Sequence, residues 1–97
     1  MTSDRKRVVQ RSTKFRKDVR LASKQGKDLA LLQEIIDLLA DDIPLPAKYN
    51  DHALSGKWKG HRECHLTPDW LLVYRKTNTG KLLLLLVRTA SHSNLDF

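Results

Sequence analysis

The sequence predicts an α+β domain in which a helical hairpin packs on one face of a small antiparallel sheet, in the order β-α-α-β-β-β. Three observations predict this fold class. Apolar residues repeat at the helical period in two adjacent segments of the first half. Three segments with strand character, separated by short turns, fill the second half, and a further short strand candidate at residues 8–10 precedes the first helix. With 97 residues, the chain is expected to form one domain, residues 1–97.

The first helix is predicted to begin near Lys14, after a short strand at residues 8–10. Ser12 or Thr13 can cap its first turn with a side-chain oxygen. Gly26 is expected to end it, because glycine tolerates the left-handed conformation that closes a last turn. At 100° per residue, the stripe of this helix that faces the core consists of Phe15, Val19 and Ala22.

A second helix is predicted to follow at once, with Asp28 as its cap. This helix is expected to end before Pro44 and Pro46, because proline lacks the amide proton that a helix interior needs. So short a connection between two helices favours an antiparallel hairpin. The buried face of the second helix is expected to contain Leu29, Leu32, Ile35, Ile36 and Leu39.

Residues 45–56 are interpreted as a loop, and strands are predicted at residues 57–65, 70–76 and 81–89. The turns between these strands are short, which indicates an antiparallel meander. Leu82 to Val87 are all apolar, so the last strand should be central and covered on both faces. If this strand alternates regularly, Arg88 shares a face with Leu84 and Leu86.

Positive charge is concentrated at the start of the chain. The first 28 residues hold ten Lys and Arg against three Asp, so the whole formal charge of +7 lies there and the rest is neutral. A basic surface confined to one segment favours a polyanionic partner, most commonly nucleic acid, although a solvated helix face is the alternative. The basic residues expected to bind RNA are Lys14, Lys17, Arg20, Lys24 and Lys27.

Neither a membrane-spanning segment nor a signal peptide is expected, because the longest apolar run, Leu82 to Val87, is far short of about 20 residues. A cytoplasmic protein that does not bind a membrane is therefore expected. Cys64 is the single cysteine, which excludes an intramolecular disulfide. Clustered histidines can also bind zinc, but no paired His/Cys spacing is present beyond Cys64 beside His65, so neither a metal nor a cofactor is expected.

The four histidines all lie in the second half of the chain, at positions 52, 61, 65 and 92. Metal-free RNA cleavage needs one group to accept the 2′-OH proton, one to protonate the leaving 5′ oxygen, and a cation for the phosphate. Imidazole suits both proton transfers, and arginine suits the phosphate. A lone histidine is more often a surface or core residue than a catalytic one, and Trp58 and Trp70 are more often core than base-stacking residues.

Two segments narrow these alternatives. The stretch LPAKYNDHALSGKWKGHRECHLTPDWLLVYR, residues 45–75, resembles the central signature of YafQ-type toxins of the RelE/ParE superfamily. The tail RTASHSNLDF, residues 88–97, resembles the C-terminal signature of that family. With the basic hairpin included, the resemblance covers nearly the whole chain. It implies a RelE-like fold and a type II toxin that acts as a ribosome-dependent endoribonuclease, or mRNA interferase, without a metal.

The resemblance also implies site residues and partners. His65 and His92 are carried over as proton-transfer groups assisted by Asp69, with Arg88 on the scissile phosphate and His52 positioning it. Trp70 and Phe97 are carried over as RNA-binding residues, whereas His61 stands where the family more often has an aromatic residue and is left out. The implied partners are a cognate antitoxin, the ribosome with its A-site mRNA, and operator DNA through the antitoxin complex.

The tail departs from the family pattern at two positions. Ala90 replaces a common glycine, and Asp96 separates Leu95 from Phe97, where the family usually has phenylalanine directly after the leucine. Two alternatives stay open at this point. One is a ParE-like inhibitor of DNA gyrase on the same fold, and the other is a catalytically degenerate RNA-binding member, because fold alone does not decide function.

Overall fold

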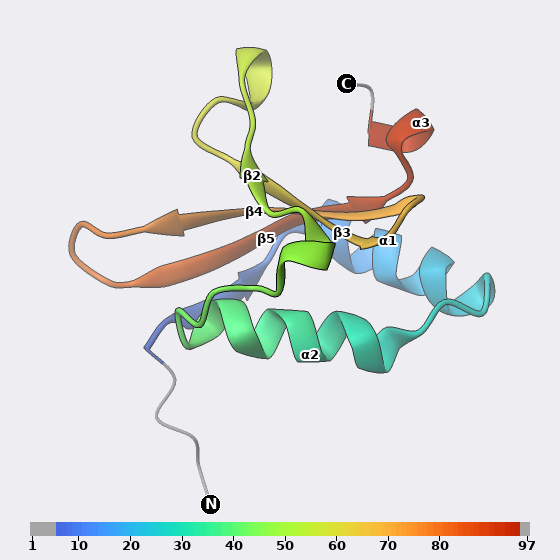
Figure 1. Ribbon diagram of the computed structural model, residues 1–97, viewed down its shortest axis with the longest axis horizontal. Helices are drawn as coiled ribbons and strands as arrows, with labels where there is room; N and C mark the ends of the chain where they lie inside the picture. The colour runs from blue at the N-terminus through green and yellow to red at the C-terminus, as the bar shows by residue number, and fades with distance from the viewer. Residues whose placement is uncertain (1–5, 96–97) are drawn as a thin grey trace, which may run out of the picture.

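The computed structural model describes residues 6–95 as a five-stranded sheet with two helices on one face (Figure 1). The sheet order is β1-β5-β4-β3-β2, and the first and last strands in this order are its edges. The main helices, α1 and α2, lie on one side of the sheet, and a short helix, α3, lies on the other (Figure 1). In chain order the elements are β1 (Val8–Arg11), α1 (Thr13–Lys24), α2 (Leu29–Ala40), the 3-10 turn η1 (Ala47–Tyr49), β2 (His52–Ala53), the 3-10 turn η2 (Gly56–Trp58), β3 (Arg62–Thr67), β4 (Trp70–Thr77), β5 (Leu83–Ala90) and α3 (His92–Leu95).

The two main helices begin where their capping residues predict. Ser12 Oγ accepts a hydrogen bond from the Phe15 amide at 2.9 Å. Asp28 Oδ1 accepts one from the Leu31 amide at 3.1 Å, and Gly26 stands between the helices with φ +74°. Side-chain acceptors at these positions satisfy amide groups that have no partner within the first turn. The expected helix boundaries are therefore confirmed.

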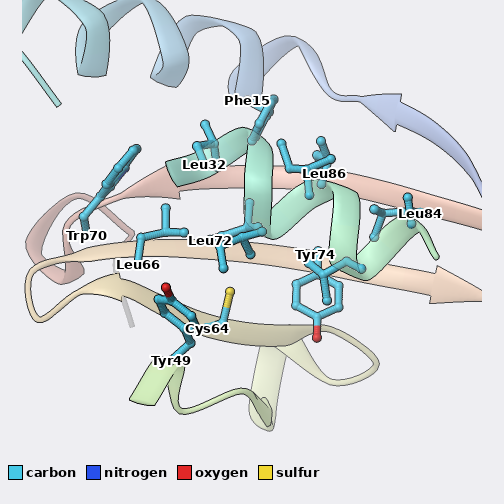
Figure 2. Close-up of a cluster of buried hydrophobic side chains, with 14 of the residues drawn as sticks. Phe15, Leu32, Tyr49, Cys64, Leu66, Trp70, Leu72, Tyr74, Leu84 and Leu86 are labelled. Atoms are coloured by element: carbon cyan, nitrogen blue, oxygen red, sulfur yellow. The ribbon is translucent and has the colours of Figure 1, made fainter. Parts of the chain in front are cut away.

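The larger hydrophobic core lies between the helices and the sheet (Figure 2). Phe15 of α1 and Ile35 of α2 are almost fully buried, and they pack over the inner face of the central strands. Strands β3, β4 and β5 supply that face with Cys64, Leu66, Trp70, Leu72, Tyr74, Leu84 and Leu86.

The opposite face of the sheet carries a smaller apolar cluster. Leu71 and Val73 of β4 and Leu95 of α3 are buried in it. Leu54, Trp58, Val87 and Ala90 pack against them while partly buried. The central strand β5 thus contacts apolar groups on both faces, as its composition predicts, and the outer face has room for polar groups around a small apolar centre.

Two predictions about the sheet are wrong. The sheet is mixed, because β1 pairs with β5 in parallel, with Val8 opposite Leu83. The edge strand β1 comes first in the chain, and α1 and α2 follow it before the chain returns to the sheet. Residues 57–61, predicted to be strand, instead form the end of the 3-10 turn η2 and the turn that follows it, and the expected loop at 45–56 contains the short strand β2.

A β-bulge in β5 changes the face that Arg88 occupies. Tyr74 pairs with Leu86, but the preceding residue, Val73, pairs with Arg88, so Val87 is an extra residue in the ladder. Leu86 belongs to the helix-side core, whereas Val87 packs in the smaller cluster. Since directly paired residues of neighbouring strands share a face, Arg88 lies with Val73 on the outer face. The expectation that Arg88 shares a face with Leu84 and Leu86 is therefore wrong.

Arg7, just before β1, binds the end of α2 and the connection between β4 and β5. Its side chain is 8% exposed, and its Nε donates to Asp42 Oδ1 at 2.6 Å, just after α2. Its guanidinium also donates to the Thr77 carbonyl oxygen at 2.9 Å and to Asn78 Oδ1 at 2.7 Å in the β4–β5 connection. Arg7, with Lys76, lowers the pKa of Asp42 to about 2. No helix within residues 6–95 has the length and apolar character needed to span a membrane.

Candidate functional site

One cross-strand row on the outer face brings together residues from four strands. His52 of β2 pairs with Glu63 of β3, Glu63 pairs with Val73 of β4, and Val73 pairs with Arg88 of β5. His65 lies two residues after Glu63, so it points to the same face. Residues from sequence positions 52 to 88 therefore meet because the strands of the meander, and the short strand β2, lie side by side.

Glu63 is the centre of the site. Its side chain is only 3% exposed, and Oε1 lies 3.3 Å from Nε2 of His52, 3.3 Å from Nε2 of His65 and 3.8 Å from Nε2 of His92. The ring centroids of His52 and His65 are 5.9 Å apart, and those of His65 and His92 are 5.7 Å apart. One buried carboxylate oxygen is thus surrounded by three imidazoles, which we call the histidine cluster.

The rings of the histidine cluster lie around the Glu63 carboxylate and differ in their other contacts and in their exposure. His52 Nδ1 is 2.7 Å from the Asn50 carbonyl oxygen, and its Nε2 faces Glu63. Both ring nitrogens of His52 thus face an oxygen atom, which fixes the orientation of the ring. His92 is more exposed than its neighbours, with a side-chain exposure of 54% against 21% for His65. His92 is therefore the histidine of the cluster most accessible to a substrate.

Arg88 reaches around the edge of β5 to α1. Its Nε donates to Asp18 Oδ2 at 2.7 Å, and its Nη2 donates to Asp18 Oδ1 at 3.1 Å. Asp18 Oδ2 also accepts the Thr89 amide at 3.0 Å. The hydrogen-bonded Asp18 carboxylate raises the pKa of Arg88 above its ordinary value. Two strand spacings, about 10 Å, separate the backbones of Glu63 and Arg88, so this cation belongs to the rim of the site.

Asp69 and Trp70 do not join the histidine cluster. Asp69 is exposed in the β3–β4 turn, and it lines a hollow of about 490 Å³ together with Arg88 and Trp70. Trp70 is 1% exposed in the helix-side core, and the Lys27 ammonium lies 5.7 Å from its ring centroid. A ring covered in this way does not fit a role in stacking on a base. The carboxylate that contacts the histidines is Glu63, not Asp69.

The basic residues expected to bind RNA are mostly on the outer side of α1. Lys27, which follows α1, is half-buried beside Trp70. Phe97, the predicted base-stacking residue of the tail, lies outside the residues that the structure describes. The exposed cations of α1 are Lys14, Arg16, Lys17, Arg20 and Lys24.

His61 and Cys64 lie outside the histidine cluster and make contacts that fit a structural role. His61 Nδ1 lies 3.2 Å from the Trp58 carbonyl oxygen, and its ring packs edge-on against Trp58 with the centroids 5.5 Å apart. Cys64 is fully buried, and burial raises the pKa of its thiol to about 12. Neither group contacts Glu63 through a hydrogen bond or ion pair that would add it to the site.

Sequence reasoning missed Glu63 and Asp18. A signal for Glu63 was available, because residues two apart in a strand share a face and His65 was already a candidate. Asp18 is the single acidic residue of α1 and stands among five cations, but nothing in the sequence pairs it with Arg88, 70 residues later.

One group of side chains could hold a metal ion. The candidate donor atoms of His52, Glu63 and His65 all lie within 4.8 Å of one another. Two imidazoles and a carboxylate are a donor set that suits divalent transition metals. Such an ion would occupy the same nitrogens that would otherwise exchange protons.

Comparison with known proteins decides the family. The profile of the family described as the bacterial toxin of type II toxin–antitoxin systems, YafQ, matches residues 7–96. The chain belongs to the YafQ family. It is 43% identical to the mRNA interferase toxin YafQ of Escherichia coli over 90 residues, which cover 92% of this chain and 95% of that relative.

Solved structures of the YafQ family and of similar toxins share the fold. The toxin–antitoxin complex DinJ–YafQ of E. coli contains a chain that matches with a TM-score of 0.83 and 43% identity, covering 93% of this chain and 97% of that chain. A metal-bound toxin from Helicobacter pylori matches with a TM-score of 0.85 and 46% identity, covering 91% and 97%. The predicted membership of the YafQ family, an α+β RelE-like fold and an endoribonuclease toxin are thereby confirmed.

Proposed function

We propose that this YafQ-family toxin cuts translated mRNA on the ribosome by acid–base catalysis in the histidine cluster, without needing a metal. The observation that carries the proposal is the position of Glu63 Oε1, within 3.3 to 3.8 Å of three imidazoles. A carboxylate shared by neighbouring imidazoles places groups that can accept and donate protons at one site, which is what cleavage at a ribose 2′-OH needs.

The proposed reaction assigns proton transfer to His65 and His92. One imidazole accepts the 2′-OH proton while the 2′ oxygen attacks phosphorus, and the other donates a proton to the departing 5′ oxygen. Glu63 lies between them and balances the charge of whichever ring is protonated. His52, held through Nδ1 by the Asn50 carbonyl oxygen, positions the phosphate.

Arg88 is proposed to neutralise the charge that develops on the scissile phosphate. Its guanidinium is held by Asp18 at the rim of the site through Nε and Nη2, and Nη1 is proposed to donate to the phosphate. Asp69 lines the same hollow as Arg88 and is proposed to act on the flanking nucleotides.

Ribosomal RNA is the proposed docking partner of α1, because this helix exposes five cations. Binding to a polyanion releases counterions and tolerates many RNA sequences. A cognate antitoxin is proposed as the inhibitor, since E. coli YafQ forms a complex with DinJ and this chain matches it over nearly its full length.

The decisive experiment maps cuts in translated and untranslated mRNA with the wild-type protein and with His92→Ala. Cuts are expected only in translated message, and the variant should lose about 100-fold or more in rate, which is typical of removing a general acid or base. His61→Ala is the histidine control, because His61 lies outside the histidine cluster, and it should lose far less of the rate than His92→Ala. Equal cutting of untranslated RNA would contradict ribosome dependence.

The docking proposal is tested by reversing charge at Lys17, Arg20 and Lys24. The triple variant should bind ribosomes more weakly, and the slope of log affinity against log salt should become shallower, because the helix neutralises fewer phosphates and releases fewer counterions. The measurement is ribosome co-sedimentation at several salt concentrations. An unchanged salt slope would contradict docking through α1.

Metal independence is tested with a chelator. Because the metal-bound H. pylori toxin is similar to this chain, divalent zinc or copper is proposed to bind His52, Glu63 and His65 and to inhibit. The toxin is stripped with EDTA, and the chelator is removed before ribosomes are added; this stripped protein should still cleave, and cleavage should fall when either ion is added. Loss of cleavage after stripping that is restored by the ion would contradict the metal-free mechanism.

A further inference from the structure

A hollow of about 440 Å³ lies beside the histidine cluster on the outer face of the sheet. It is bordered by the segment that leaves β2, by Glu63 of β3 and by His92 of α3, and we call it the Trp58 hollow. Its size falls within the roughly 300–1,000 Å³ of small-ligand sites. Its lining residues are Leu54, Ser55, Gly56, Lys57, Trp58, Glu63 and His92.

The second oxygen of Glu63 indicates that this hollow takes a ligand. Oε1 faces the three imidazoles, but Oε2 is buried and has no hydrogen-bond partner among residues 6–95. A buried carboxylate oxygen without a donor is unfavourable, because it has lost its water and gained no replacement. Since Glu63 lines the hollow, a ligand with an N–H or O–H group could supply the missing donor.

The remaining walls have the chemistry of a nucleotide site. Leu54 and Trp58 provide apolar surface, and both pack against the smaller core, which holds them in place. Lys57 is exposed at the mouth and carries positive charge. Single-stranded RNA is commonly bound in this way, with a splayed base against an aromatic side chain and a cation near the backbone phosphate.

We propose that the Trp58 hollow binds one nucleotide of the RNA substrate, next to the phosphate that is cut. The base lies against Leu54 and Trp58, and Glu63 Oε2 accepts a hydrogen bond from the nucleotide. Lys57 faces the phosphate on the outer side of that nucleotide. This inference rests on the proposed ribonuclease function, and it adds a substrate contact that none of the predicted RNA-binding residues provides.

His92 makes the hollow useful for catalysis. It lines the hollow and also belongs to the histidine cluster, at 3.8 Å from Glu63 Oε1. A nucleotide seated in the hollow therefore has one of its own phosphates beside the imidazoles. Glu63 would then act twice, through Oε1 on the proton-transferring rings and through Oε2 on the substrate.

A second hollow, on the other side of His65, provides an internal comparison. It has about 490 Å³ and is lined in part by Lys48 and Tyr49. The Lys48 ammonium already lies 5.1 Å from the Tyr49 ring centroid. Among the described residues that line it, none has a buried polar side-chain atom without a partner. The two hollows thus have similar volume but differ in the unpartnered carboxylate oxygen.

The test titrates the full-length protein with the dinucleotide ApA carrying a 2′-O-methyl group on its 5′ ribose, which blocks cleavage. Amide and indole NMR shifts are expected for residues 54–58 and His92, and not for residues 48–50. Lys57→Ala should weaken binding about two- to fivefold, as expected for the loss of one exposed phosphate contact, and Leu54→Ala should weaken it at least as much. Thermal unfolding of both variants checks that they fold.

Lys59→Ala is the matched control, because Lys59 is an exposed cation two residues away that does not line the hollow. Shifts confined to residues 48–50, no shifts up to millimolar probe, or equal weakening by Lys57→Ala and Lys59→Ala would overturn the proposal. The cut-mapping experiment distinguishes failure of the Trp58 hollow proposal from failure of the proposed ribonuclease function. Cuts that persist at wild-type rate in Lys57→Ala and Leu54→Ala would overturn the hollow alone. Dinucleotide binding without any mRNA cleavage would overturn the ribonuclease function alone.

Discussion

The two faces of the sheet are built for different purposes. The helix-covered face buries a large continuous core that includes Phe15 and Ile35. The outer face buries only Leu71, Val73 and Leu95 fully, and it surrounds them with histidines and the buried Glu63. Because hydrophobic stabilisation grows with buried apolar area, the helix side supplies most of the stability. The outer side can therefore hold a buried charge that a core would not tolerate. Separate effects on stability and on activity are the expected consequence.

Glu63→Gln should break the outer face most severely. Glutamine has nearly the same shape but no charge, so the three imidazoles lose the carboxylate that balances their protonation. We expect the cleavage rate to fall by about 100-fold, the size of a general acid–base contribution, while the unfolding temperature changes little. The measurements are the rate of cutting in translated mRNA and thermal unfolding. An unchanged rate would remove Glu63 from the site.

Ile35→Ala provides the contrast on the helix side. Ile35 is 0% exposed, and its truncation should lower the free energy of unfolding by about 2–5 kcal/mol. Below the unfolding transition, the cleavage rate per folded molecule should stay at the wild-type value. If this variant lost activity while still folded, the two faces would not be independent.

Asp18→Asn sharpens the comparison at the edge where the faces meet. Asparagine keeps one acceptor but loses the charge that fixes the Arg88 fork, so kcat should fall about tenfold with a smaller change in KM. Glu34→Gln is the control, because it removes one negative charge from an exposed position on α2. A similar change in kcat for both variants would show a general charge effect and would contradict the positioning of Arg88 by Asp18.

Asp42→Asn should have the smallest effect, and only on stability. Arg7 and Lys76 lower the pKa of Asp42 from 3.8 to about 2 in the folded protein. The group therefore contributes stability above pH 4 that is lost as the pH falls towards 2. Asparagine should cost about 1–2 kcal/mol at pH 7, since the carboxylate is partly exposed, and should flatten the pH dependence of unfolding between pH 4 and 2. Denaturant unfolding at several pH values measures this, and an unchanged pH dependence would contradict it.

Local signals in the sequence predicted local structure well. Ser12, Asp28 and Gly26 marked the helix ends because capping depends on residues a few positions apart. The parallel pairing of β1 with β5 joins residues about 75 positions apart, and no short-range pattern encodes it. The bulge at Val87 was equally hidden, because an unbroken apolar run offers no alternation in which an extra residue could be seen.

Part of the candidate site could likewise be predicted from the sequence, and part could not. Its histidines and Arg88 were found through residue type and family resemblance, and the structure brings His52, His65 and His92 around one atom. The identity of that atom was missed, because residue type alone does not single out an acidic residue between Arg62 and Cys64; only its two-residue spacing from His65 in a strand places both side chains on one face. The placement of Asp69 away from the histidines depends on the β3–β4 turn, which sequence patterns define only roughly.

The bulge at Val87 is also the position at which β5 can lose one residue without changing the face on which Arg88 lies. Removing Val87 would leave Arg88 directly after Leu86, and the ordinary alternation of a strand would then still direct Arg88 outward. Removing or adding one residue anywhere else between Leu83 and Ala90 would exchange the two faces for part of the strand. When sequences of this family are aligned, a one-residue gap in the last strand therefore belongs at position 87, and a relative without that residue keeps the same arginine on the same side.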